Sequence, residues 1–99
     1  MATTDLLTLR EEIDELDEKI IQTLGQRFRV TDKVGKLKAT TGLNPVDPER
    51  EARQLERFAQ LASQHSVNAA LVEKIFRAVI DEVVANHQFL AVSSDRLQF

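Results

Sequence analysis

The chain has 99 residues, which suits one domain with a core of its own, and a formal net charge of −3. This charge gives no basic excess for a nucleic-acid partner, and the lack of cysteine excludes disulfides and cysteine-ligated metals. No apolar run approaches the roughly 20 residues of a membrane span, and the start of the chain lacks the apolar stretch of a secretory signal. We therefore expect a cytoplasmic protein with no membrane association and no metal. Its class should be all-α, since glycine and proline are scarce and no segment alternates with period two.

A first helix is predicted over residues 4–41, which contain no proline and repeat apolar residues at spacings of three and four. These residues are Leu6, Leu9, Ile13, Leu16, Ile20 and Leu24, followed less regularly by Phe28, Val30, Val34 and Leu37. An unbroken helix of this length measures on the order of 50 Å, whereas a compact domain of this size has a radius of gyration of about 13 Å. The apolar stripe therefore needs a cover, and the simplest cover is a second copy of the chain. Within the helix, Gly25 and Gly35 each cost about 1 kcal/mol relative to alanine, which suggests close approach of another backbone.

The charges of this helix are segregated, with acids in the first half and bases in the second. This order complements the helix dipole, and that effect alone can account for Arg29, Lys33 and Lys36. Arg27 and Lys38 differ, because eleven residues return to nearly the same face about 16 Å further on, where two cations can hold a small anion. Arg10 lies about 25 Å from Arg27, too far to serve the same site within one chain. In an antiparallel or intertwined pair, Arg10 of one copy can reach the site of the other.

Two further helices are predicted, at residues 48–63 and 69–90. Gly42 is a candidate left-handed cap of the first helix, and Asp47 followed by Pro48 is typical of a helix start. Asn68 is a good cap for the third helix. The tail, residues 91–99, has little periodicity and is expected to be frayed. The sequence thus predicts a single three-helix domain over residues 1–99.

The common catalytic arrangements are missing from this sequence, which has no nucleophile beside a base, no glycine-rich phosphate loop and no metal-ligand spacing. What stands out is a set of cations with a few further polar residues: Arg10, Arg27, Lys38, Arg50, Glu51 and His87. In an acidic protein such a set suits a small dianion such as a dicarboxylate, because arginine binds carboxylates through two hydrogen bonds. The competing interpretation is a helical dimer whose charges are simply solvated.

The residues also carry a resemblance to a known family. From about Leu6 to Gln88, in order and without gaps, the chain resembles the all-helical class of chorismate mutase. The most specific segments are LREEID with Arg10, the segment from Arg27 through VGKLK with Lys38, and DPERE with Asp47, Arg50 and Glu51. The resemblance implies an intertwined homodimer that rearranges chorismate to prephenate without a cofactor, in the biosynthesis of phenylalanine and tyrosine.

The resemblance further implies a role for each matching residue. Arg27, together with Arg10 from the partner, would grip the two carboxylates of the substrate, and Lys38 would bond one carboxylate and the ether oxygen. The ring hydroxyl would be held by Glu51 and the backbone near Asp47. Arg50 would border the site and order Asp47 and Glu51.

The sequence departs from the family at Val83 and His87, where the family commonly has serine and glutamine. Valine cannot donate a hydrogen bond, but His87 can, and more strongly when protonated. We therefore expect His87 to donate to the ether oxygen; otherwise His87 packs at a helix end, or Gln88 turns inward. Two other functions stay open: an isochorismate-pyruvate lyase or amino-chorismate mutase on the same scaffold, and a non-catalytic dimerisation or regulatory module.

Overall fold

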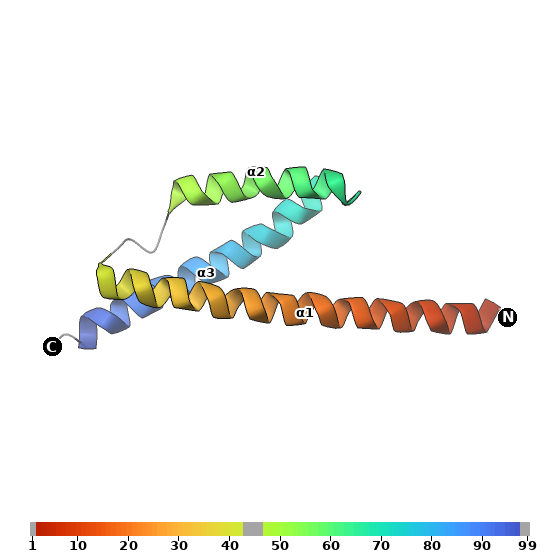
Figure 1. The fold of residues 1–99 in the computed structure, drawn as a ribbon, viewed down its shortest axis with the longest axis horizontal. Helices are drawn as coiled ribbons and strands as arrows, with labels where there is room; N and C mark the ends of the chain where they lie inside the picture. Colours follow the sequence, from red (N-terminus) through yellow and green to blue (C-terminus); the bar gives the residue numbers. More distant parts are fainter. Residues whose placement is uncertain (1, 43–46, 98–99) are drawn as a thin grey trace. The chain divides into compact units, whose positions relative to one another are not determined.

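The computed structural model describes the backbone of residues 2–42 and 47–97 and the side chains of residues 5–42 and 47–86. Three helices follow one another (Figure 1): α1 (Ala2–Thr41), α2 (Pro48–Gln64) and α3 (Ala69–Leu97). The described residues contain no strand, so the predicted all-α class with three helices is confirmed. The contacts divide the chain into two compact units, Met1–Thr31 and Asp32–Phe99, and the assignment of a single domain stays a prediction.

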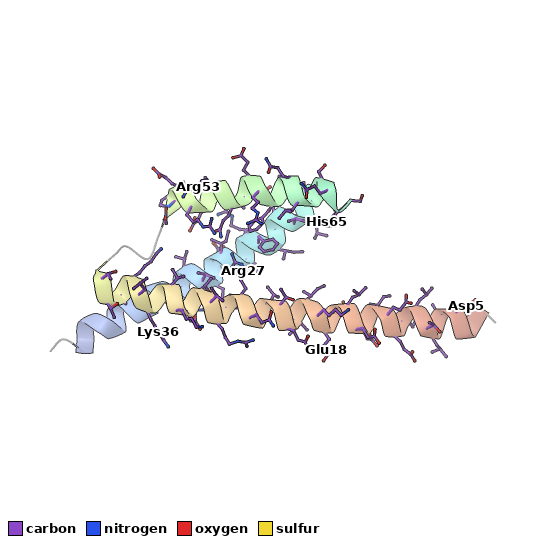
Figure 2. The ribbon with its side chains drawn as sticks, viewed as in Figure 1. Asp5, Glu18, Arg27, Lys36, Arg53 and His65 are labelled. Carbon is purple, nitrogen blue, oxygen red and sulfur yellow. The ribbon has the colours of Figure 1, made fainter. Side chains whose placement is uncertain are left out.

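The first unit is the N-terminal three-quarters of α1, a helix whose apolar stripe is open to solvent. Eight large apolar side chains of this unit, between Leu6 and Val30, are 47–68% exposed, whereas Leu24 and Phe28 are half-buried. Its acidic residues are exposed as well, and Figure 2 shows Asp5 and Glu18 projecting from the helix. The stripe predicted from the sequence is therefore present, and the single chain leaves most of it uncovered.

Glycine has different surroundings at the two helical positions that the sequence singles out. A Cβ added to Gly25 would lie 3.5 Å from Nη1 of Arg29, which is an ordinary contact with the end of a flexible side chain. The close backbone approach suggested for Gly25 thus does not arise within this chain. Gly35, in contrast, is buried.

The C-terminal end of α1 is closed by threonine side chains and by glycine. The hydroxyls of Thr40 and Thr41 donate to the carbonyl oxygen of Leu37, at 2.9 and 2.8 Å. Gly42 has a φ of +75°, which confirms it as the predicted left-handed cap. The connection at residues 43–46 lies outside the described residues.

Helices α2 and α3 form a hairpin whose turn is built from local hydrogen bonds (Figure 1). The N–H of Val67 donates to the carbonyl of Ala62 at 2.9 Å, and the N–H of Ser66 donates to that of Ser63 at 3.3 Å. Ser66 has a φ of 57°, so this is a Schellman motif with serine in the place that usually holds glycine. Asn68 then caps α3, because its Oδ1 accepts from the backbone N–H of Ala70 at 2.8 Å.

The packed core of the hairpin lies between its two helices. Ala62, Val79 and Ile80 are buried, with exposed fractions of 3%, 7% and 4%. The rings of Phe58 and Phe76 stack across the pair, with centroids 3.9 Å apart. These contacts join residues close in sequence, so the hairpin contains its own stabilising core.

Helix α3 extends past its predicted end near Leu90 and continues to Leu97. The physical reason is that residues 91–97 contain neither glycine nor proline, so nothing in that segment forces the backbone out of the helix. Only residues 98–99 of the predicted tail lie outside the described backbone. Within the described residues, no helix has the combined length and apolarity that crossing a membrane requires.

Candidate active site

The three cations of α1 that the sequence singles out for a site stand in two different units of the chain. Arg10 and Arg27 belong to the first unit, where Arg10 is exposed and Arg27 is half-buried. Lys38 belongs to the second unit and is half-buried, three residues after the buried Gly35. Partial burial of Arg27 and Lys38 distinguishes them from Lys33 and Lys36, which are exposed. Burial therefore favours Arg27 and Lys38 as site residues over the solvated bases between them.

The first turn of α2 is held by Asp47, as the sequence predicts. Its side-chain Oδ1 accepts a hydrogen bond from the backbone N–H of Arg50 at 3.1 Å, and its carbonyl accepts one from Glu51 at 3.0 Å. Pro48 occupies the first helical position, where the lack of an N–H costs nothing. The cap fixes the backbone that carries Arg50 and Glu51, so the predicted ordering of this turn comes from the main chain.

Exposure separates the three polar residues of this turn. Glu51 is half-buried, whereas Asp47 and Arg50 are exposed. A carboxylate in the first turn of a helix is stabilised by the unpaired N–H groups and the positive end of the helix dipole. Glu51 thus presents an acceptor for a hydroxyl group at the inner side of the turn.

The inner face of α3 carries Val83 between the core and the C-terminal part of the helix. Val83 is half-buried and follows the buried Val79 by four residues, so the two share a face. His87 comes one turn later, on a continuous helical backbone, and its side chain lies outside the described residues. Asn86 is a half-buried polar residue on the same side of the helix, which sequence reasoning missed. Asn86 follows Val79 by seven residues and Val83 by three, and this helical spacing could have identified it as a residue of the same face.

The arrangement brings part of the predicted set into one unit. Lys38, Asp47, Arg50, Glu51 and Val83 all belong to the second unit, and Arg10 and Arg27 belong to the first. No group of three or more His, Cys, Asp or Glu side chains gathers around a common point in the described part of the chain. The second unit thus carries cations, a capped helix start and a half-buried carboxylate, which are groups of the kind that bind an anionic molecule with a hydroxyl group.

Comparison with known proteins gives a consistent result. The sequence profile of chorismate mutase type II matches residues 9–88. The chain is 36% identical to the T-protein of Haemophilus influenzae and 35% identical to the bifunctional chorismate mutase/prephenate dehydratase of Escherichia coli, over 91% and 86% of its length. It spans only 25% and 22% of those two relatives. It is also 33% identical to the chorismate mutase of Methanocaldococcus jannaschii, over 77% of each chain.

The family profile covers both ends of the candidate site, from Arg10 on α1 to His87 on α3. The match runs through all three helices and the capped start of α2. The resemblance found in the sequence is therefore confirmed, and the chain belongs to the chorismate mutase type II family.

Proposed function

We propose that this chain catalyses the rearrangement of chorismate to prephenate, as a cytoplasmic enzyme of aromatic amino-acid biosynthesis. The observation that carries the proposal is the retained polar set on a matching three-helix scaffold. The family match includes the positions of all six polar residues: Arg10, Arg27, Lys38, Asp47, Arg50 and Glu51. A solvated surface has no need of that set in that order.

The reaction explains why neither a nucleophile nor a general base was found. It is a unimolecular pericyclic shift, in which one C–O bond breaks while one C–C bond forms within the same molecule. The enzyme must hold the enolpyruvyl arm folded over the ring, which is a task of orientation. It must also stabilise the negative charge that develops on the ether oxygen, and fixed donors do this best.

The roles of the α1 cations follow from their charge and position. Arg27 grips one carboxylate of chorismate through two parallel hydrogen bonds, and Arg10 of a partner subunit grips the other. Lys38, which is half-buried, bonds one carboxylate and the ether oxygen. Partial burial supports these roles, because electrostatic interactions strengthen as water is excluded.

The first turn of α2 is proposed to hold the ring of the substrate. The half-buried Glu51 accepts a hydrogen bond from the ring hydroxyl, with the backbone near Asp47 beside it. Arg50 borders the site, and its backbone N–H is the group that fixes the Asp47 side chain at 3.1 Å. The cap thereby preorganises the hydroxyl-binding end of the site before substrate arrives.

At Val83 and His87 on α3, this chain differs from the residues that the family commonly has. Val83 supplies an apolar surface where the family commonly has a hydroxyl, so one polar contact with substrate is lost. His87 is proposed to supply the second donor to the ether oxygen, through an imidazole N–H. If that imidazole acts as a cation, turnover falls as pH rises through the range in which the ring loses its proton.

A homodimer is proposed as the active form. The apolar stripe of α1 supports it, since eight large apolar side chains of the first unit are about half exposed or more in the single chain. A patch of that kind marks an interaction surface in a soluble protein. The dimer also allows Arg10 to act in the partner's site, which its separation of about 25 Å from Arg27 forbids within one chain.

The test is a steady-state assay of the purified chain on chorismate, with isochorismate and an amino analogue of chorismate in parallel and the products identified. Prephenate from chorismate, with little action on isochorismate, is the expected result. Salicylate and pyruvate from isochorismate would instead show a lyase. No turnover of chorismate, isochorismate or an amino analogue by a folded dimer would contradict the enzymatic proposal and favour the non-catalytic module.

A further inference from the structure

Helix α2 withdraws a glutamine from solvent and leaves two alanines exposed. The residues of this helix that are half-buried or buried are Glu51, Gln54, Leu55, Phe58, Leu61 and Ala62. Ala52 and Ala59 are exposed instead. Glutamine is mostly found at protein surfaces, whereas alanine is often buried. The position of Gln54 on the inner side of the helix is therefore not explained by hydrophobicity, and its amide needs another reason to be there.

Gln54 lies beside the residue proposed to bind the ring hydroxyl. It follows Glu51 by three residues and precedes Phe58 by four, and side chains at these spacings are neighbours on a helix, with Cβ atoms about 5–6 Å apart. The Phe58 ring stacks on Phe76 of α3, with centroids 3.9 Å apart. Glu51, Gln54 and Phe58 thus form one line along α2, from its capped start to the core of the hairpin.

The Gln54 side chain makes no hydrogen bond within residues 5–42 and 47–86. A polar group that is partly withdrawn from water without a partner costs free energy, which a ligand restores when it supplies the partner. The amide has two N–H donors and a carbonyl acceptor, whereas a carboxylate such as that of Glu51 only accepts. The two neighbouring side chains together therefore offer a bound group both an acceptor and a donor.

We propose that Gln54 is a second contact of the ring substituent, beside Glu51, and that its amide lets the chain rearrange an amino analogue of chorismate as well as chorismate. The inference rests on the proposed function and deepens it, because it names a further substrate of the same site. With chorismate, the ring hydroxyl donates to Glu51, and its oxygen accepts an N–H of Gln54. That oxygen has two lone pairs, so the backbone near Asp47 can contact it as well.

The same amide suits an amino group after a rotation. An amino group on the ring is protonated at neutral pH and, like the ammonium of lysine, has three donors and no acceptor. Rotation about the last torsion of Gln54, which is broad and roughly two-fold in its preference, exchanges N–H for C=O. Glu51 then accepts a charge-assisted hydrogen bond, which is stronger than its bond to a neutral hydroxyl. The pair of residues therefore accommodates both substituents.

The exchange of hydroxyl for amino leaves the reaction itself unchanged. The ether C–O bond breaks and a C–C bond forms within one molecule, and the ring substituent takes no part in either change. The amino analogue keeps both carboxylates of chorismate, so Arg27 and Lys38 retain their proposed roles. The product is the amino analogue of prephenate, and no further reactant is needed.

Three ring substituents test the contact. The substrates are chorismate, its amino analogue and an analogue with hydrogen in place of the ring hydroxyl. We expect kcat/KM of the wild type for the amino analogue to lie within about tenfold of that for chorismate. Gln54→Met keeps the length of the side chain and removes the amide, so it should lower both values about tenfold. For the analogue with hydrogen the change should stay within about twofold, because no group is left for the amide to bind.

Gln54→Glu separates the two orientations of the amide. It keeps an acceptor and removes the donor, so the ratio of kcat/KM for the amino analogue to that for chorismate should rise about tenfold. The matched controls are Gln60→Met and Gln60→Glu, since Gln60 is an exposed glutamine of the same helix. Both should stay within about twofold of the wild type for every substrate. A partial loss of folded enzyme cancels in the ratio, because both substrates are measured on the same protein.

Four results would overturn the inference, and they are distinguishable from one another. Turnover of chorismate without the amino analogue would leave the proposed function standing and remove the second substrate. No loss in Gln54→Met, or an equal loss for all three substrates, would show that the amide of Gln54 does not contact the ring substituent. An unchanged ratio in Gln54→Glu would mean the same. No turnover of any substrate by the folded protein would overturn the proposed function together with this inference.

Discussion

The first unit and the α2–α3 hairpin differ in where their apolar side chains go. In the hairpin, Val79 and Ile80 are 7% and 4% exposed, and two stacked rings join the helices. In the first unit, Leu9 and Ile20 are 54% and 59% exposed, although their spacing is equally regular. Both regions are amphipathic helices, but the hairpin buries the centre of its apolar face within one chain, although Leu71 and Ile75 near the start of α3 are still 50% and 48% exposed.

This contrast separates the part of the molecule that a single chain packs from the part that the proposed dimer would complete. The hairpin combines capped helices, a local turn and a core from residues near in sequence, so it can stabilise itself. A lone helix gains little from its own hydrogen bonds and depends on packing of its apolar face. The residues proposed for the site follow the same division, since Lys38 and Glu51 belong to the second unit and Arg10 to the first.

The largest expected effect is on kcat/KM, and it tests whether the proposed site combines residues of two chains. Arg10→Ala and Arg27→Ala should each lower kcat/KM by about 10²–10³, because each removes a charged donor. If Arg10 serves the partner's site, a mixture of the two variants contains heterodimers with one intact site. Random mixing in a two-fold dimer then restores about a quarter of the wild-type sites.

The measurement is a chorismate assay after the two variants have been mixed and left to exchange subunits. Arg29→Ala is the control, because Arg29 is an exposed arginine of α1 outside the proposed set. It should keep activity within about twofold of wild type. A mixture no more active than its components would show that Arg10 and Arg27 act within one chain or not at all.

The same substitution in the two regions should have different consequences. Ile80→Ala removes a buried side chain and should lower the free energy of unfolding by about 3 kcal/mol. Ile20→Ala should instead raise the dissociation constant of the dimer about a hundredfold, because its apolar surface is buried only by the partner. Urea unfolding and sedimentation equilibrium measure the two quantities separately. Ile20→Ala without effect on the dimer would mean that the stripe stays solvated.

The ends of the helices show what local sequence can predict. Gly42, Asp47 and Asn68 were identifiable because capping uses a side chain or a conformation supplied by that very residue. The turn at Ser66 was not predicted, since serine seldom adopts a positive φ and gives no signal of it. The end of α3 was missed for a related reason: no residue in 91–97 stops a helix.

The residues proposed for the site could be named from the sequence, and their assembly stays a proposal. The cap at Asp47 follows from a local motif, whereas the half-burial of Glu51 was not predicted. The proposed gathering of Arg10 with Arg27 requires contacts with a second chain, which local patterns in one sequence do not specify. Asn86 was overlooked because a polar residue on an apolar stripe interrupts the pattern that locates the stripe.

A smaller effect is expected from substitution of His87, where the chain departs from the residue that the family commonly has. His87→Ala should lower kcat/KM by about tenfold at pH 6 and by less at pH 8, because only the protonated ring is a charged donor. His87→Gln should keep activity and remove the pH dependence. His65→Ala is the control, since His65 is exposed at the end of α2. A flat wild-type profile together with an unaffected His87→Ala variant would rule the role out.

Substitution of the two glycines of α1 compares two positions with different surroundings within a single helix. Gly25→Ala should stabilise the protein by about 1 kcal/mol, because the added methyl meets only the end of the Arg29 side chain. Gly35→Ala should be destabilising, because Gly35 is buried. Thermal unfolding of both variants measures these changes in stability. A lower stability of Gly25→Ala would indicate that a partner backbone packs against Gly25.

The smallest effect concerns the hairpin turn and should leave the dimer untouched. Ser66 holds a φ of 57°, which costs a non-glycine residue about 1 kcal/mol. Ser66→Gly removes that cost but adds freedom to the unfolded chain, so the net gain should be about 0.5 kcal/mol, or roughly 3 °C in Tm. Ser63→Gly, inside α2, should instead lose about 1 kcal/mol. A gain at Ser66 without any change in the dimer dissociation constant would show that the turn stabilises the hairpin alone, whereas a changed constant would mean that assembly reaches the turn as well.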